Sequence, residues 1–154
     1  MAKRKTNYQP FWRFLFVVYV ALMVWLLFGR SYNWVDGLSY EQMLQQNINL
    51  QPLRTIQNYW YVVCRGPDAP LFAHCVLNLA GNVVMFVPAG WLLPRIFRRF
   101  QKFWRFALGS CIIIFLIESI QLFTLLGSFD VDDILLNLAG VLAGYLIWRL
   151  AGKK

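Results

Sequence analysis

The sequence predicts an all-α membrane protein with four transmembrane helices, and three observations support this fold class. First, the chain of 154 residues is 59% hydrophobic and 18% aromatic, which is typical of a small polytopic membrane protein rather than a soluble domain. Second, four apolar runs are long enough to span a bilayer, at about residues 11–28, 71–93, 106–126 and 134–150. Third, Lys and Arg cluster between these runs rather than on a polar face, so we do not expect nucleic acid as a partner.

The first apolar run follows a basic start at Lys3, Arg4 and Lys5. A signal peptide would begin in the same way. However, this run is too long for a typical signal core, begins with bulky aromatic residues and ends without a small-x-small cleavage pattern. We therefore interpret residues 11–28 as a retained helix.

A long polar segment, residues 29–70, carries two short helical signals. Ser39 and Gln42 match a capping box, and Pro52 is suited to begin a second helix. The apolar residues that would share one face of this second helix are Leu53, Ile56, Trp60 and Val63. With the tyrosines beside them they predict an interfacial helix near residues 52–64, although a helix packed on the bundle would give the same pattern.

The second run contains Pro88, which predicts a kink, and Pro94, which predicts its exit from the membrane. The basic segment 95–105 follows. It lies on the same side as the two termini, and these three regions hold twelve of the fifteen Lys and Arg residues, whereas the opposite side has only Arg30, Arg54 and Arg65. The positive-inside rule therefore predicts that both termini are cytoplasmic, and that residues 29–70 and the 127–133 turn face outward.

A short internal repeat links the second and fourth runs, because LNLAG occurs at 77–81 and again at 136–140. A duplicated helical hairpin would produce this echo, and so would chance, since Leu and Ala are common here. Gly81, Gly140 and Gly144 lack side chains where helices would approach, and the last two form a GxxxG pattern. The pattern predicts close packing of the fourth helix.

Polar residues recur within three of the apolar runs. His74, Asn78 and Asn82 are four residues apart, as are Asp133 and Asn137, while Glu118 and Gln121 are three apart. At 1.5 Å per residue, Asn78 lies about 10 Å, Glu118 about 12 Å and Asn137 about 6 Å below the predicted outer ends of their helices. Lipid cannot satisfy these groups, so we expect the stripes to face one another or a water-filled pocket.

Each polar group also has a structural interpretation. Buried amides such as Asn78 and Asn137 often serve as packing contacts between membrane helices. Asp130, Asp132 and Asp133 are equally suited to capping the fourth helix and to binding a ligand. A carboxylate inside an apolar run is costly, and for Glu118 we favour function. The three cysteines show no metal-ligand spacing, and we expect no metal and no cofactor.

Three stretches resemble the VanZ-like family of bacterial membrane proteins. They are residues 49–56 (NLQPLRTI), residues 78–90 (NLAGNVVMFVPAG), and residues 118–121 (ESIQ) followed by 130–133 (DVDD) and 137–140 (NLAG). The resemblance implies one VanZ-like transmembrane domain over residues 1–154, in a multi-pass protein of the bacterial plasma membrane associated with resistance to teicoplanin and related lipoglycopeptides. The family pattern often has a basic residue shortly before the aspartates, where this chain has Gly127 and Ser128, and Arg54 is a candidate to replace it opposite Glu118 or Asp130.

Two classes of function follow. In the first, an outward pocket binds a membrane lipid or a lipid-linked envelope component and lowers susceptibility to these drugs; its predicted lining is Arg54, His74, Asn78, Asn82, Gln121, Asp130, Asp132 and Asn137. In the second, the protein is an intramembrane enzyme with Glu118 and Asp133 as catalytic acid/base residues and Arg54 on an anionic head group. A transporter that uses Glu118 as a proton relay is a third and weaker hypothesis. Four helices are few for a transporter unless a homo-oligomer forms.

Overall fold

The computed structural model describes residues 9–29 and 35–152, so the predictions for the basic start at residues 3–5 and for Arg30 lie outside the described residues. Within these described residues, four long helices are apolar enough to cross a membrane: α1 (Gln9–Phe28), α4 (Phe72–Ile96), α5 (Phe103–Phe123) and α6 (Val131–Ala151). The smaller elements are α2 (Tyr40–Gln46), β1 (Ile48–Asn49), α3 (Arg54–Cys64), η1 (Arg98–Gln101) and β2 (Phe129–Asp130). The predicted helical membrane fold with four spans is confirmed.

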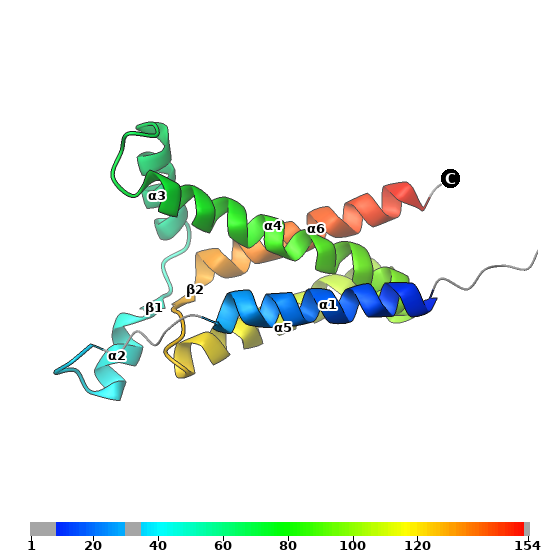
Figure 1. Ribbon diagram of the computed structural model, residues 1–154, viewed down its shortest axis with the longest axis horizontal. Coiled ribbons are helices and arrows are strands. Elements are labelled where there is room, and N and C mark those ends of the chain that lie inside the picture. Colours follow the sequence, from blue (N-terminus) through cyan, green and yellow to red (C-terminus); the bar gives the residue numbers. More distant parts are fainter. Residues whose placement is uncertain (1–8, 30–34, 153–154) are drawn as a thin grey trace, which may run out of the picture.

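The long helices alternate in direction, as hairpin connections require (Figure 1). Helices α4 and α6 run in parallel and pack along each other, while α1 and α5 run the opposite way. The first residues of α1, the connection from α4 to α5 and the end of α6 lie at one end of the bundle, and α2, α3 and both strands lie at the other. We call these the basic end and the strand end.

Four predicted helix limits differ from the observed ones by three residues: α4 ends at Ile96 instead of 93, α5 runs over Phe103–Phe123 instead of 106–126, and α6 begins at Val131 instead of 134. Helix α4 continues through Pro94 to Ile96, and the Pro94 carbonyl in its last turn accepts a hydrogen bond from Gln101 Nε2 at 3.2 Å. Helix α5 begins at Phe103, so Arg105 lies inside it rather than before it. A long arginine side chain can reach the headgroup level from within the first helical turn, which permits this position.

Close backbone contact joins α4 and α6. A Cβ atom built on Gly140 would lie 2.0 Å from the Val83 carbonyl oxygen, and one on Gly144 would lie 2.0 Å from that of Val87. The predicted close packing at the GxxxG pattern is therefore confirmed. Gly90 on α4 makes the reciprocal contact, which the sequence analysis missed, whereas Gly81 has open space beside it and does not serve the contact for which it was predicted.

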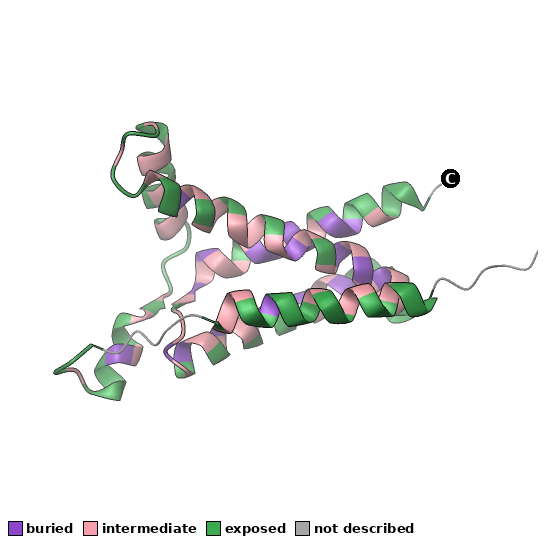
Figure 2. Ribbon diagram, viewed as in Figure 1, coloured by how far each residue is buried: buried purple, intermediate pink, exposed green. Residues whose placement is uncertain are grey.

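The apolar core lies where α4, α5 and α6 meet, and the lipid-facing sides of the helices are exposed (Figure 2). Phe106 and Tyr145 stack with ring centroids 4.4 Å apart, and the Tyr145 hydroxyl donates to the Gln101 carbonyl at 2.8 Å. Met23 is the one buried residue of α1, whose Tyr19 hydroxyl donates to the Met85 carbonyl at 2.9 Å. Helix α1 is thus fixed to α4 by few contacts, in agreement with the largely exposed surface that it shows.

Helix α2 has the predicted capping box, with Ser39 and Gln42 each bonded to the other's backbone N–H. Helix α3 begins at Arg54 rather than near Pro52, and its predicted apolar face is divided: Ile56 and Val63 are half-buried, while Trp60 is 61% exposed. The helix contacts α4 and α6 at the strand end. Helix α3 therefore packs on the bundle and at the same time keeps the aromatic side chain of Trp60 exposed.

Candidate functional site: a polar cavity at the strand end

The chain at the strand end is held by a two-residue parallel pairing of β1 with β2, an element that the all-α prediction did not include. Asn49 lies opposite Asp130 in this pairing. Each oxygen of the Asp130 carboxylate lies 3.2 Å from Asn49 Nδ2, and Oδ2 also accepts from the Thr55 hydroxyl at 2.6 Å. Asp130 Oδ1 accepts the Asp132 backbone N–H at 2.8 Å, which caps the start of α6. One carboxylate thus joins β1, α3 and α6.

Asp132 has a different role, although it is only two residues away. Its side chain is fully buried and accepts three backbone N–H bonds from the start of α3: Leu53 at 2.5 Å, Thr55 at 2.8 Å and Ile56 at 3.1 Å. A carboxylate at a helix start satisfies unpaired N–H groups and the positive end of the dipole. Asp132 therefore caps α3, which precedes it by more than 70 residues, and not its own helix.

These contacts correct part of the predicted pocket. Asp132 lines none of the cavities described below, and the oxygens of Asp130 are engaged with protein donors. Capping of the fourth helix, the other role considered for the aspartates, describes Asp130 but not Asp132. Asn49 and Thr55 belong to this cluster and were missed as individual contributors, because no local pattern indicates pairing with a residue 75 or more positions away.

A cavity of about 460 Å³ opens between the long helices beside this cluster, and we call it the polar cavity. It is lined by Leu26, Leu27, Asn47, Tyr59, His74, Leu77, Asn78, Asn82, Met85, Glu118, Gln121, Leu126, Gly127, Ser128, Asp133 and Asn137. Three stripes of polar residues identified in the sequence, from α4, α5 and α6, meet in this one space. The prediction that they face one another or a pocket agrees with this arrangement.

Two hydrogen bonds inside the cavity connect the helices. Asn137 Nδ2 of α6 donates to Glu118 Oε1 of α5 at 3.1 Å, and both side chains are almost fully buried, at 2% and 3% exposed. The backbone amide of Asp130 also interacts with the Glu118 carboxyl group. Asn82 Nδ2 of α4 donates to Asp133 Oδ1 of α6 at 2.6 Å. Amide donors therefore point at carboxylates in both pairs.

Other lining residues close the sides of the cavity. Gln121 Nε2 donates to the Leu27 carbonyl at 3.1 Å and so connects α5 to the end of α1. His74 is exposed, and the Tyr59 ring meets it edge-on with centroids 5.8 Å apart. Burial, and then the negative charge of Asp133, raise the pKa of the Tyr59 phenol above its usual value. The lining of the polar cavity therefore includes an aromatic pair, Tyr59 and His74, beside its amide and carboxyl groups.

Two amide oxygens in this lining are left over. Within residues 9–29 and 35–152, Asn78 Oδ1 and Asn137 Oδ1 are buried and have no hydrogen-bond partner. The described lining contains no Lys or Arg. The cavity is consequently rich in hydrogen-bond acceptors.

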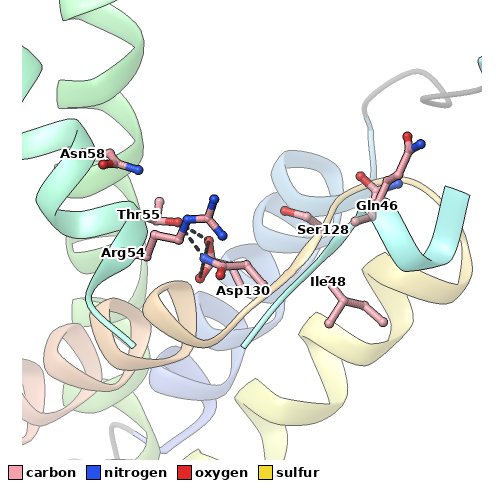
Figure 3. Close-up of a pocket in the computed structure, with 9 residues that line it drawn as sticks. Gln46, Ile48, Arg54, Thr55, Asn58, Ser128 and Asp130 are labelled. Carbon is pink, nitrogen blue, oxygen red and sulfur yellow. Dashed lines mark hydrogen bonds between the residues drawn. The ribbon is translucent and has the colours of Figure 1, made fainter. Parts of the chain in front are cut away.

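Arg54 lies in a second, adjoining cavity of about 300 Å³, which we call the Arg54 groove. Figure 3 shows Arg54 and Thr55 close to Asp130, with Gln46 and Ser128 toward the other side of the groove. The groove and the polar cavity share Asn47 and Ser128 in their linings. Arg54 is therefore placed near Asp130, and it is not in the polar cavity with Glu118, which was the other position considered.

The described residues contain no group of three or more His, Cys, Asp and Glu side chains able to hold a metal ion. Cys64, Cys75 and Cys111 are free thiols, and only Cys75 is buried. The chemistry that the polar cavity offers is hydrogen bonding to donors and proton exchange at Glu118 and Asp133. Both predicted catalytic residues thus lie in one cavity.

Comparison with known proteins agrees with the motifs. The family model described as VanZ/LLP1 matches residues 16–152, nearly the whole chain. No curated protein and no solved structure matches the chain.

Proposed function

Because the chain belongs to the VanZ-like family, we propose that it is a bacterial plasma-membrane protein whose polar cavity binds a polar group of a membrane lipid or lipid-linked envelope component. In this proposal, binding lowers susceptibility to teicoplanin and related lipoglycopeptides. The family membership and the four apolar helices support the membrane location. The remaining support comes from the charges at the two ends of the bundle and from the cavity itself.

The distribution of basic residues gives the proposed orientation. Among the described residues, the Lys and Arg side chains at the basic end are Arg13, Arg95, Arg98, Arg99, Lys102, Arg105 and Arg149. The positive-inside rule assigns this end to the cytoplasm. The Arg95 guanidinium lies 3.9 Å from the Trp91 ring centre and 4.9 Å from that of Trp12, an aromatic arrangement suited to the headgroup level. The polar cavity then opens to the outside, where lipoglycopeptides act on the envelope.

The observation that carries the proposal is the buried Glu118–Asn137 pair with unsatisfied oxygens around it. If these residues served packing alone, their buried polar atoms should be paired, because an unpaired buried acceptor costs about 1–3 kcal/mol. Instead, two amide oxygens lack partners among the described residues, beside a cavity large enough for a headgroup. Unmet hydrogen bonding in a preformed space is the expected property of a binding site.

The test is drug susceptibility in a sensitive Gram-positive host. The intact chain should raise the inhibitory concentration of teicoplanin more than that of vancomycin, which lacks the lipid tail. Glu118→Gln should abolish this difference at equal membrane level. Gln57→Ala is the matched control, because Gln57 is an exposed amide of α3 that lines neither the Arg54 groove nor the polar cavity. If the intact chain leaves teicoplanin tolerance unchanged, the proposed role is wrong.

A second candidate is catalysis on a lipid-linked envelope component, and the specific observation favouring it is that Glu118 and Asp133 share the cavity. Two carboxylates held by different amides are suited to separate acid and base roles. Mass spectrometry of lipids and wall precursors, with and without the protein, distinguishes catalysis from binding. A new or depleted species that depends on both carboxylates would favour the enzyme, and identical profiles would exclude it.

A further inference from the structure

We infer that the ligand group recognised by the polar cavity is a primary ammonium group, so that an aminophospholipid headgroup or another amine-bearing molecule is the occupant. This inference rests on the proposed function and specifies its ligand. It is drawn from the acceptors of the lining that have no partner in the described chain and from the charges nearby.

Three amide side chains of the lining donate to the protein itself. Asn137 donates to Glu118, Asn82 donates to Asp133, and Gln121 donates to a backbone carbonyl of α1. The acceptors that remain for a ligand are the Oδ1 atoms of Asn78 and Asn137, which have no partner in the described chain, and the carboxyl group of Glu118 next to the latter. Asn137 is 2% exposed, so its unpaired atom is deep in the lining and not at a solvated rim.

The charge balance selects among ligands. An anionic group in the polar cavity would lie near the Glu118 and Asp133 carboxyl groups and would meet no Lys or Arg in the described lining, which is unfavourable. A hydroxyl brings one donor and also needs a donor in return. An ammonium group brings three donors, no acceptor and a positive charge. It therefore complements two amide oxygens and a carboxylate better than these alternatives do.

The surroundings also accommodate the rest of an aminophospholipid headgroup. The volume of about 460 Å³ is much larger than an ammonium group alone needs. Arg54 lies in the groove that shares Asn47 and Ser128 with the polar cavity, so a phosphate attached to the ammonium would have a guanidinium on its side of the protein. A soluble amine would use the ammonium contacts alone.

The experiment uses the full chain in nanodiscs containing equal amounts of phosphatidylethanolamine, phosphatidylcholine and phosphatidylglycerol. Lipids retained after mild detergent extraction are counted by native mass spectrometry. Choline keeps the positive charge but has no N–H donor, and glycerol has hydroxyl donors but no cation. We expect ethanolamine lipid to be retained about tenfold over both, because a charge-assisted hydrogen bond is lost with either substitute.

A second arm identifies the source of the amine. Delipidated protein in detergent is titrated with O-phosphoethanolamine while thermal unfolding is followed. Stabilisation by this soluble compound, without lipid selectivity in nanodiscs, would assign the site to a soluble amine. Lipid selectivity without such stabilisation would assign it to the aminophospholipid. Either result supports recognition of an ammonium group.

Variants locate the selectivity. Asn78→Leu removes an acceptor that has no partner in the described chain, so it should fold normally and lose the preference, and Glu118→Gln should weaken it. Gln57→Ala, at an exposed residue of α3 that lines neither cavity, should keep it. The inference is overturned if neither arm shows a response, if choline lipid is retained as well as ethanolamine lipid, or if the preference survives in both cavity variants. Loss of teicoplanin tolerance in Glu118→Gln would still support the proposed function in that case, so the two failures are distinguishable.

Discussion

Replacing Asp132 with alanine should free α3 from the bundle without unfolding the transmembrane helices. The carboxylate is fully buried and is shared by three backbone N–H groups, those of Leu53, Thr55 and Ile56. No side chain of α3 itself caps its start, since the N-cap residue is Leu53 at φ 65°. Removal of the carboxylate therefore leaves all three donors without their partner.

The size of the effect follows from these bonds. A hydrogen bond to a charged acceptor is worth about 1.5–3 kcal/mol, so three bonds at the lower limit give about 4.5 kcal/mol for local opening of α3. At about 1.4 kcal/mol per factor of ten, this corresponds to roughly a thousandfold more open helix. Asp132→Asn keeps one acceptor oxygen, and we expect about half of the loss, or roughly a thirtyfold change.

Hydrogen–deuterium exchange of residues 54–64 in detergent or nanodiscs measures this opening directly. Exchange should accelerate in Asp132→Ala, less so in Asp132→Asn, while amides in α4 and α6 stay protected. Asp133→Asn is the comparison variant, because the neighbouring carboxylate accepts a hydrogen bond from Asn82 of α4. Unchanged protection of α3 in Asp132→Ala would refute the capping role.

Three further predictions concern packing, the unpaired amide and the cavity rim. Gly144→Ala should lower the unfolding free energy by about 1–3 kcal/mol in thermal or denaturant unfolding, because its Cβ would clash with a carbonyl of α4, whereas Gly81→Ala should be neutral or stabilising because the space there is open. Asn78→Leu should leave the Tm equal or higher, since it removes a buried acceptor without a partner in the described chain; a lower Tm would show that the oxygen is satisfied. Tyr59 has a raised pKa, so its contribution to stability is present below the ordinary value of 10.0 and is lost as the pH rises through the folded pKa; NMR titration of labelled tyrosine should show this pKa falling in Asp133→Asn.

The sequence was sufficient for those parts of the site that depend on helical periodicity. Residues at spacings of three and four share a helix face, so the stripes through Asn78, Glu118 and Asn137 could be recognised, and the cost of lipid exposure implied that they meet. The structure places all three in one cavity. The GxxxG pattern predicted the contact of α6 for the same reason, because small residues four apart form a continuous surface.

The rest depends on contacts between distant segments. Nothing local distinguishes Asp132, which caps α3, from Asp133, which bonds α4, because their roles are set by which segment lies opposite each one. The pairing of Asn49 with Asp130 likewise requires the 48–49 segment to return beside the start of α6. Gly90 was overlooked because it has no glycine partner at a spacing of four, and its neighbour is a carbonyl on another helix.

The most direct test of the polar cavity as the functional site is an experimental structure of the chain in nanodiscs that contain phosphatidylethanolamine. The prediction is density for a bound headgroup within hydrogen-bond distance of Asn78 Oδ1 and Asn137 Oδ1, next to Glu118. Density in the Arg54 groove for the phosphate of the same molecule would agree with it. A cavity that is closed, or that holds only water with both amide oxygens paired to protein donors, would contradict it.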